Sequence, residues 1–265
     1  MTTTSFAVED YRPSVLSSRP ELRAVVFDVD GTLVDSERDG HRVAFNLAFE
    51  EFGLPYRWGE AEYGELLHVT GGQRRIDSYL VTQAVEASER KRLAPALHAR
   101  KTDLLLTMVD EGRLQLRPGA KRLLDELAGT GVQLAVATTG SRTWVDRLLR
   151  RLLPEVHFHA VVTGDDVTNR KPDPEAYVIA LDRLDADPRH AVAVEDSGEG
   201  LLAARAADLR CAIVVNEYTV GHDLSAADLV LSGFGAPGSP AEVLADKAAT
   251  NCRGVLDAAT LTALL

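Results

Sequence analysis

The segment Ala24-Val25-Val26-Phe27-Asp28-Val29-Asp30-Gly31-Thr32-Leu33 decides the fold. It begins with a short apolar run, which is typical of a buried strand, and it continues with aspartate, glycine and threonine. Similar runs, mostly continuous and rich in valine, occur at residues 134–137, 160–162, 191–194, 212–215 and 228–231. Continuous runs favour a parallel sheet covered on both faces, because a half-exposed strand would alternate apolar and polar residues.

Helical patterns occupy most of the intervals between these runs, at residues 119–129, 142–153, 174–184 and 199–207. This alternation of strands and helices predicts an α/β fold with a doubly wound, Rossmann-like parallel sheet. The first two runs are separated by 106 residues, which is too long for one crossover in a compact unit. A second structural unit therefore interrupts the sheet after its first strand.

The patterns within this insert predict helices at residues 41–51, 60–69, 74–83 and 88–111. We therefore predict an α/β core formed by residues 21–36 and 116–232, and a small helical cap domain formed by residues 37–115. Residues 1–20 contain many Ser, Thr and Pro residues and are expected to form a mobile tail. Residues 233–265 are expected to form a helical extension.

The composition limits the partners and the compartment. The chain has 265 residues, a net charge of -11 and a hydrophobic fraction of 45%. So acidic a chain argues against nucleic acid or an anionic membrane as partner, although a local basic cluster can still bind a small anion. The two cysteines, Cys211 and Cys252, lack metal-ligand spacing, and residues 1–20 lack the apolar core of a secretory signal. We expect a monomeric cytoplasmic protein, with a plastid as the alternative compartment.

Polar residues follow the predicted strands at the edge where α/β sheets bind ligands. Alone, the Asp-x-Asp-Gly segment could be a turn, Thr138 a helix cap and Lys171 a solvated lysine. Together, however, the carboxylates would repel one another unless a cation lay between them. The residues expected at this edge are Asp28, Asp30, Thr138, Lys171, Glu195 and Asp196.

The chemistry of this set indicates phosphoryl transfer. Its ligands are oxygens, without Cys or His, which favours Mg²⁺ over zinc. The Asp28 carboxylate can attack phosphorus and form an aspartyl-phosphate. Asp30, two residues further along, can point the same way and act as general acid and base. Thr138 and Lys171 would supply a hydroxyl and a positive charge for the transferring phosphoryl group.

These residues resemble the motifs of the haloacid-dehalogenase superfamily. Residues 27–33 are similar to its first motif, and Thr138, Lys171 and the Glu195-Asp196 pair match the second, third and fourth. The resemblance implies that Mg²⁺ is bound by Asp28, by the backbone oxygen of Asp30 and by Asp196, with Glu195 assisting. The insert resembles the small α-helical cap of the phosphoglucomutase-like subgroup.

Within the insert the chain resembles the CbbY type of this superfamily. The similarity lies in residues 35–42, 44–46, 62–63, 66–67, 70–72, 75–76, 98, 101–102 and 116–119. Resemblance to this type implies a phosphatase that hydrolyses xylulose-1,5-bisphosphate to xylulose-5-phosphate and so removes an inhibitor of ribulose-bisphosphate carboxylase. The match departs at residues 139–141, which leaves the phosphate contacts of that loop open.

A bisphosphate needs a second cluster of basic residues to bind its far phosphate. The insert offers such a cluster near Gly71 and Gly72, whose small size lets a ligand approach the backbone closely. Taken singly, Arg74 and Arg75 would be solvated charges, Tyr63 a packing residue and His41 a structural histidine. The motif match favours a binding role instead. The expected substrate-binding residues are Glu37, His41, Tyr63, Thr70, Gly71, Gly72, Arg74, Arg75, His98, Lys101 and Thr139.

Four alternatives stay open from the sequence alone. A β-phosphoglucomutase-like sugar phosphomutase would use the same four motifs and return the phosphoryl group to the sugar. A phosphoglycolate phosphatase would need no distal basic cluster. A dehalogenase would use the Asp28 nucleophile but no metal and no acid at Asp30. A non-catalytic binding module would not need a complete set of catalytic residues.

Overall fold

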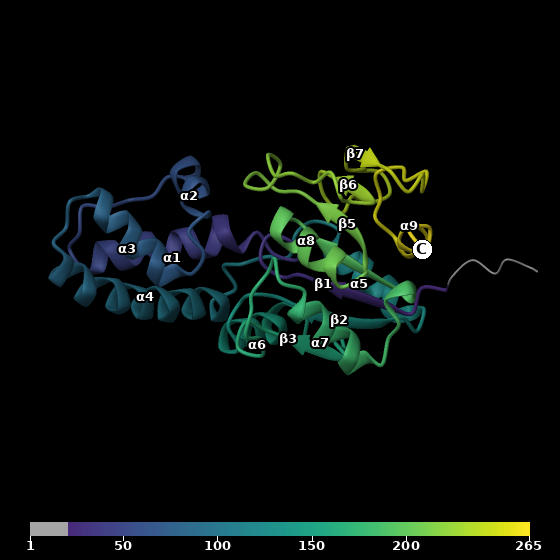
Figure 1. Cartoon of the computed structure of the whole chain (residues 1–265), viewed down its shortest axis with the longest axis horizontal. Helices are drawn as coiled ribbons and strands as arrows, with labels where there is room; N and C mark the ends of the chain where they lie inside the picture. The colour runs from purple at the N-terminus through teal and green to yellow at the C-terminus, as the bar shows by residue number, and fades with distance from the viewer. Residues whose placement is uncertain (1–20) are drawn as a thin grey trace, which may run out of the picture.

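The computed structural model describes residues 21–265, so the predicted tail at residues 1–20 lies outside the described part. The molecule has two parts, a group of helices at one end and a sheet with its covering helices at the other (Figure 1). Residues 37–115 form the helical part, as expected from their pattern, and they contain helices but no strand. These helices are η1 (Glu37–His41), α1 (Arg42–Glu51), α2 (Glu60–Leu66), α3 (Gly72–Thr82) and α4 (Ala87–Asp110).

A seven-stranded sheet forms the centre of the other part, in the order β3-β2-β1-β4-β5-β6-β7. The strands are β1 (Ala24–Phe27), β2 (Gln133–Ala137), β3 (Ala160–Val162), β4 (Ala191–Glu195), β5 (Arg210–Val214), β6 (Leu229–Leu231) and β7 (Val243–Asp246). All pairings from β3 to β6 are parallel, and β7 pairs antiparallel with β6. The doubly wound parallel fold predicted from the sequence is therefore confirmed.

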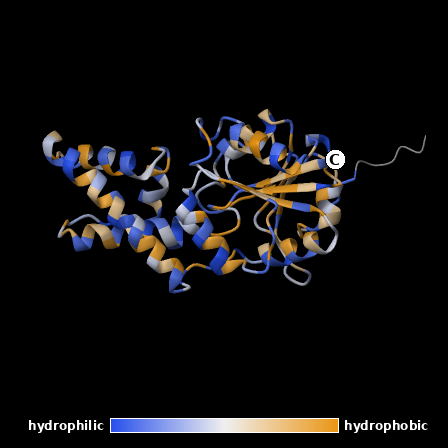
Figure 2. Cartoon of the chain, turned by 90° about the horizontal axis from the view of Figure 1, so that it is seen from below, coloured by the Kyte–Doolittle hydropathy of each residue, from blue (hydrophilic) through white to orange (hydrophobic). Residues whose placement is uncertain are grey.

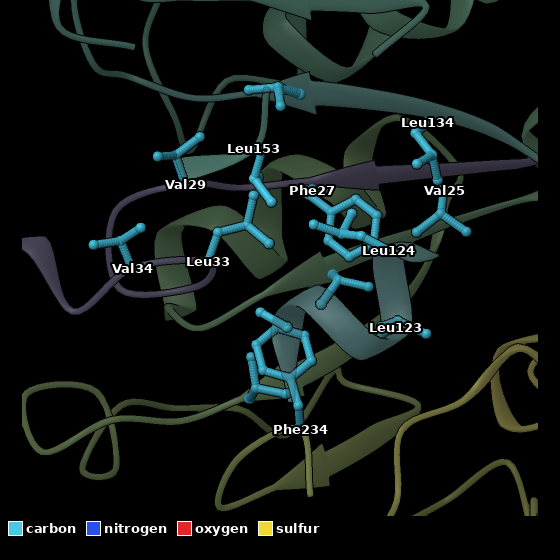
Figure 3. Packing of buried hydrophobic residues seen from close by; sticks show 14 of the residues in the cluster. Val25, Phe27, Val29, Leu33, Val34, Leu123, Leu124, Leu134, Leu153 and Phe234 are labelled. Atoms are coloured by element: carbon cyan, nitrogen blue, oxygen red, sulfur yellow. The ribbon is translucent and has the colours of Figure 1, made fainter. Parts of the chain in front are cut away.

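Helices cover both faces of the sheet because successive strand residues point to opposite sides. Val25 and Phe27 face one apolar cluster, which includes residues of α5 (Ala120–Gly129), α6 (Arg142–Leu152) and α9 (Ala258–Thr262). Ala24 and Val26 face another, which α7 (Glu175–Leu184) and α8 (Gly198–Ala206) close. Figure 2 shows the strands as apolar ribbons within more polar helices, and Figure 3 shows the first cluster in detail. The short turn η2 (Pro188–His190) leads into β4.

The insert has an apolar core of its own, rich in aromatic residues. Trp58 is fully buried and packs edge-on against Phe49 and Tyr79, with ring centroids 4.9 and 5.2 Å apart. Burial of several large rings gives a small helical unit enough apolar contact to hold its shape. Within residues 21–265, none of the helices is long and apolar enough to cross a membrane.

The helical extension predicted for residues 233–265 is wrong for most of that segment. β7 adds an antiparallel edge strand to the sheet, and the short helix α9 appears only near the end. Glycines interrupt a helix in this segment at close approaches of the backbone. A Cβ on Gly235 would lie 1.9 Å from the carbonyl oxygen of Gly254, and both glycines have positive φ.

Candidate active site

The sheet topology brings the predicted polar residues to one edge. β1 lies between β2 and β4, so the chain winds outwards on either side of it. Phe27 at the end of β1 is in register with Val194 on β4, and the residues that follow each therefore lie side by side. Such a reversal of strand order opens a crevice at the carboxyl ends of the strands, which is where this type of sheet binds ligands.

Three buried carboxylates meet in this crevice. Asp28, Glu195 and Asp196 each place a ligand atom within 4.8 Å of the others. Burial and the neighbouring carboxylates raise the pKa of Asp28, although Lys171 opposes this. Burial and Glu195 raise the pKa of Asp196 to about 8. Like charges held this close favour a cation, and a set of oxygen ligands suits a hard ion such as Mg²⁺.

Lys171 is the one cation in direct contact with this cluster among the described residues. Its ammonium group donates to Asp28 Oδ1 at 2.8 Å, to Glu195 Oε1 at 2.5 Å and to the carbonyl oxygen of Ala137 at 2.9 Å. Burial lowers the pKa of Lys171, but the two carboxylates outweigh it and raise the pKa above its ordinary value. The lysine is therefore protonated at neutral pH and holds the Asp28 carboxylate in place.

Glu195 is fixed by its surroundings. Its Oε1 also accepts a hydrogen bond from the Tyr177 hydroxyl at 2.8 Å, and its Oε2 accepts from the backbone N–H of Asp196 at 3.0 Å. Gly200 leaves room for the carboxylate, because a Cβ there would lie 2.0 Å from it. Glu195 thus serves mainly to hold Lys171 and the turn that carries Asp196.

Asp196 is oriented by residues from two other strand ends. Its Oδ2 accepts a hydrogen bond from Asn216 Nδ2 at 2.7 Å, and its Oδ1 accepts from Thr32 Oγ1 at 3.2 Å. Gly31 permits this approach, since it has a φ of +89° and a Cβ there would lie 2.4 Å from Asp196 Oδ2. Asn216 is a further functional residue that was not predicted, although it directly follows the apolar run at residues 212–215 and so lies at the ligand-binding edge of the sheet.

Arg117, which the sequence linked only to the family resemblance, has a structural role beside this site. Its guanidinium is buried and donates to the carbonyl oxygens of Gly31 and Val214 at 2.5 and 2.8 Å, and to that of Val215 at 2.6 Å. It therefore ties the loop after β1 to the end of β5. A guanidinium that spans several carbonyl groups is suited to this role because it presents several donors in a fixed plane.

Asp30 lies beside the cluster but has different partners. Its Oδ1 accepts from Ser36 Oγ at 2.5 Å and lies 3.3 Å from His41 Nε2, and its Oδ2 accepts from Trp144 Nε1 at 3.4 Å. Burial alone would raise the pKa of Asp30, but these hydrogen bonds lower it below its ordinary value. The two aspartates of the first motif are thus in opposite environments, as groups with different tasks require.

The two threonines after β2 lie at different depths. Thr138 is buried, and its hydroxyl accepts a hydrogen bond from the backbone N–H of Gly140 at 3.1 Å. Thr139 lines the cavities at the mouth of the crevice, whereas Thr138 is not among their lining residues. The Thr138 hydroxyl retains its own proton as a donor.

Two adjoining cavities connect the core to the insert. One, of about 180 Å³, contains Asp28, Lys171 and the two acids after β4. The other, of about 410 Å³, extends under the insert. They share Asp30, Glu37, Thr70, Arg75 and Thr139. The predicted substrate-binding residues that line the larger cavity are Glu37, His41, Thr70, Gly71, Gly72, Arg74, Arg75, His98, Lys101 and Thr139.

Four basic residues that line the larger cavity form what we call the basic rim of the insert: Arg74, Arg75, His98 and Lys101. Their side chains differ in how firmly neighbouring groups hold them. The Lys101 ammonium lies 2.5 Å from His41 Nδ1 and 4.8 Å from the centre of the Phe45 ring. Burial lowers the pKa of Lys101 to about 8. Burial and the nearby Lys101 also lower the pKa of His98. Arg74 is exposed and donates only to the Thr70 carbonyl oxygen among the described residues.

Tyr63 is the predicted binding residue that the structure does not bring to the cavity surface. It is fully buried, and its hydroxyl donates to Glu37 Oε2 at 2.5 Å. The Arg75 guanidinium donates to the same hydroxyl at 3.0 Å and to the carbonyl oxygen of Leu66 at 3.0 Å. Tyr63 therefore positions Glu37 and Arg75, which do line the cavities. Gly72 leaves room for His98, because a Cβ there would lie 2.7 Å from the imidazole.

Comparison with known proteins gives consistent matches over most of the chain. The model of the haloacid dehalogenase-like hydrolase family matches residues 22–208. A CBBY-like protein of Arabidopsis thaliana is 38% identical over 222 residues, which cover 81% of this chain and 70% of that protein. The CbbY protein of Rhodobacter capsulatus is 39% identical over 211 residues, covering 78% of this chain and 92% of the relative.

The same similarity extends to solved structures. A crystal structure of a CbbY mutant from Rhodobacter sphaeroides in complex with xylulose-(1,5)bisphosphate superposes with a TM-score of 0.70. The two sequences are 37% identical, and the match covers 80% of this chain and 94% of that one.

Proposed function

The chain belongs to the haloacid dehalogenase-like hydrolase family, among the CbbY proteins, and from this premise we propose that it is a Mg²⁺-dependent phosphatase of xylulose-1,5-bisphosphate. Membership makes it a sugar-phosphate phosphatase; the metal and the particular sugar are the proposal. The observation that carries it is the meeting of Asp28, Asp196, Glu195 and Lys171 beneath a cavity with a basic rim.

In the first half of the reaction, Asp28 attacks the phosphorus atom. One carboxylate oxygen forms the new P–O bond while the bond to the sugar oxygen breaks, which leaves an aspartyl-phosphate. Lys171 holds Asp28 Oδ1 at 2.8 Å and offsets the repulsion between the carboxylate and the phosphate. The Thr138 hydroxyl is proposed to donate to an oxygen of the phosphoryl group.

Asp30 moves the protons in both halves. It protonates the departing sugar oxygen and later takes a proton from the water that attacks the aspartyl-phosphate. Its hydrogen bonds keep its pKa low in the free protein. An incoming phosphate places negative charge beside it, which raises the pKa of a carboxyl group and favours uptake of the proton.

The residues of the crevice fit Mg²⁺ as the cofactor. Asp28 and Asp196 present buried oxygens that Asn216 and Lys171 hold in fixed positions, and Glu195 supports both. The backbone oxygen of Asp30 is proposed to complete the protein ligands. When bound, Mg²⁺ would neutralise charge on the transferring phosphoryl group.

The insert accounts for the proposed preference for a bisphosphate. With one phosphate at Asp28, the other end of the sugar extends into the larger cavity towards Arg75 and Lys101. A second phosphate in that position gains charge-assisted hydrogen bonds from these donors. The complex of the Rhodobacter sphaeroides CbbY mutant with xylulose-(1,5)bisphosphate supports this substrate.

The deciding experiment measures phosphate release from a panel of sugar mono- and bisphosphates, with xylulose-1,5-bisphosphate beside ribulose-1,5-bisphosphate. We expect release from the xylulose compound at a rate well above that of its epimer and of 2-phosphoglycolate. Formation of an isomeric sugar phosphate without free phosphate would instead indicate a mutase. A preference for 2-phosphoglycolate would overturn the bisphosphate assignment.

The proposed compartment is the cytoplasm, with a plastid as the alternative. Cys211 and Cys252 are both free thiols, and Cys211 is buried. Unpaired cysteines suit a reducing compartment.

A further inference from the structure

The loop after β5 links the metal-binding edge of the core to the insert. Asn216 begins this loop, where its Nδ2 donates to Asp196 and its Oδ1 accepts from the backbone N–H of Tyr218 at 2.9 Å. The Thr219 hydroxyl accepts from the backbone N–H of Asn216 at 3.0 Å. These bonds fix the backbone of Tyr218 relative to Asp196. In Figure 1 the loop between β5 and β6 extends towards α2.

The ring of Tyr218 fits against a glycine on α2. A Cβ on Gly64 would lie 2.9 Å from Tyr218 Cδ1 and 3.3 Å from its Cε1. Gly64 lies inside the helix and does not have positive φ, so its backbone conformation does not require glycine. Glycine in a helix costs about 1 kcal/mol relative to alanine. The space for the Tyr218 ring is the feature of this position that calls for glycine.

The contact leads directly to the residues that line the cavity. Tyr63, the neighbour of Gly64 on α2, packs edge-on against the Tyr218 ring with centroids 6.1 Å apart. The Tyr63 hydroxyl in turn holds Glu37 and Arg75. If the ring displaced α2, the Arg75 guanidinium would therefore move relative to Asp28. Arg75 is one of the residues proposed to bind the far phosphate.

The ring of Tyr218, rather than its hydroxyl, makes this contact. The hydroxyl is buried, and it has no hydrogen-bond partner among the described residues that meets ordinary distances and angles. Burial raises the pKa of Tyr218 to about 12, so the hydroxyl stays neutral beside Arg42. The adjacent pair between Glu217 and Arg38, at 3.3 Å, is partly exposed and adds little.

We propose that Tyr218 is a positioning residue: its ring seats against Gly64 and sets the distance between the catalytic carboxylates of the core and the basic rim of the insert. The proposal rests on the proposed function, because only a substrate that contacts both parts senses this distance. A sugar bisphosphate carries a second phosphate for the larger cavity, whereas a small aryl phosphate has none and depends mainly on the smaller cavity beside Asp28.

A double-mutant cycle tests the contact. The variants are Gly64→Ala, Tyr218→Ala and the two combined, with Tyr218→Phe as the matched control that keeps the ring. Kinetics are measured with xylulose-1,5-bisphosphate and with p-nitrophenyl phosphate, and thermal unfolding checks that each variant folds. Because Gly64→Ala acts by clashing with the ring, it should be harmless once the ring is gone.

We expect Gly64→Ala and Tyr218→Ala each to raise KM for the bisphosphate about tenfold, with a much smaller effect on the aryl phosphate. Adding Gly64→Ala to Tyr218→Ala should change KM less than about twofold, and Tyr218→Phe should behave like the wild type. Additive effects of the two substitutions, or equal effects on both substrates, would overturn the proposal. If the wild type hydrolyses the aryl phosphate but no bisphosphate, the proposed function fails instead.

Discussion

The carboxylate cluster of the core is buried throughout, whereas the basic rim of the insert is buried only in part. In the core, Asp28, Glu195 and Asp196 are buried and each accepts defined hydrogen bonds from the loops that follow other strands. On the rim, Arg75 and Lys101 are buried as well, but Arg74 is exposed and His98 is only half-buried. A group that reacts must be in place beforehand, whereas a group that recognises can adjust to its ligand. The core should therefore control turnover and the rim should control affinity.

The largest effect is expected at the nucleophile. Asp28→Asn should lower kcat by at least about a thousandfold, because an amide cannot form the aspartyl-phosphate. Phosphate release under saturating substrate measures this. The melting temperature should not fall, because the substitution removes a charge that the other two carboxylates of the cluster repel. Asp182→Asn, at an exposed aspartate on α7, is the matched control and should retain full turnover.

Removal of the metal should have the next largest effect. Treatment with EDTA should lower kcat for every phosphate ester by about a hundredfold or more, and added Mg²⁺ should restore it. Asp196→Asn should raise the Mg²⁺ concentration needed for half-maximal rate. Undiminished turnover in EDTA would show that the reaction needs no cation and would favour the metal-independent dehalogenase alternative.

The core was more predictable than the insert, because strand order and strand ends follow simple rules. Six apolar runs predicted β1 to β6, and the residues after them meet at the edge where they were expected. The sequence could not show that Tyr63 is buried beneath the cavity, since an aromatic residue on a short helix fits either a packing or a binding role. It also could not show the hydrogen bonds that lower the pKa of Asp30, which join residues from three segments.

The prediction for the C-terminal segment, residues 233–265, was wrong for a different reason. Its alanines favour a helix locally, but the free edge beside β6 offers backbone hydrogen bonds, and Val243–Asp246 pairs there instead. Local propensity is a weak guide wherever such tertiary pairing competes.

Substitutions in the basic rim should change KM for a bisphosphate more than KM for a small aryl phosphate. Arg75→Ala should raise KM for xylulose-1,5-bisphosphate about tenfold, which corresponds to about 1.4 kcal/mol, and leave KM for p-nitrophenyl phosphate almost unchanged. Arg75 also donates a hydrogen bond to the Tyr63 hydroxyl, so Arg75→Ala removes this bond as well as the charge. Arg75→Lys keeps the charge but lacks the planar guanidinium, and it therefore separates the two contributions. Arg92→Ala, at an exposed arginine on α4, serves as control. Equal effects of Arg75→Ala on both substrates would argue against a second phosphate grip.

The smallest effect is a dependence of affinity on pH. Burial lowers the pKa of Lys101 from its ordinary value of 10.5 to about 8, so its charge is present at pH 7 and largely lost by pH 9. KM for the bisphosphate should therefore rise severalfold between these values, by less where bound phosphate raises the pKa again. Lys101→Met should show a flat profile over this range. A wild-type KM that falls as the pH rises would contradict the role of this lysine.

The central claim is that Asp28 itself receives the phosphoryl group, and rapid quenching in acid during turnover of xylulose-1,5-bisphosphate tests it most directly. After proteolysis, mass spectrometry should find one phosphoryl group on the peptide that contains Asp28, and none in the Asp28→Asn variant. Product formation at full rate, with that peptide unmodified at every time point, would contradict the account.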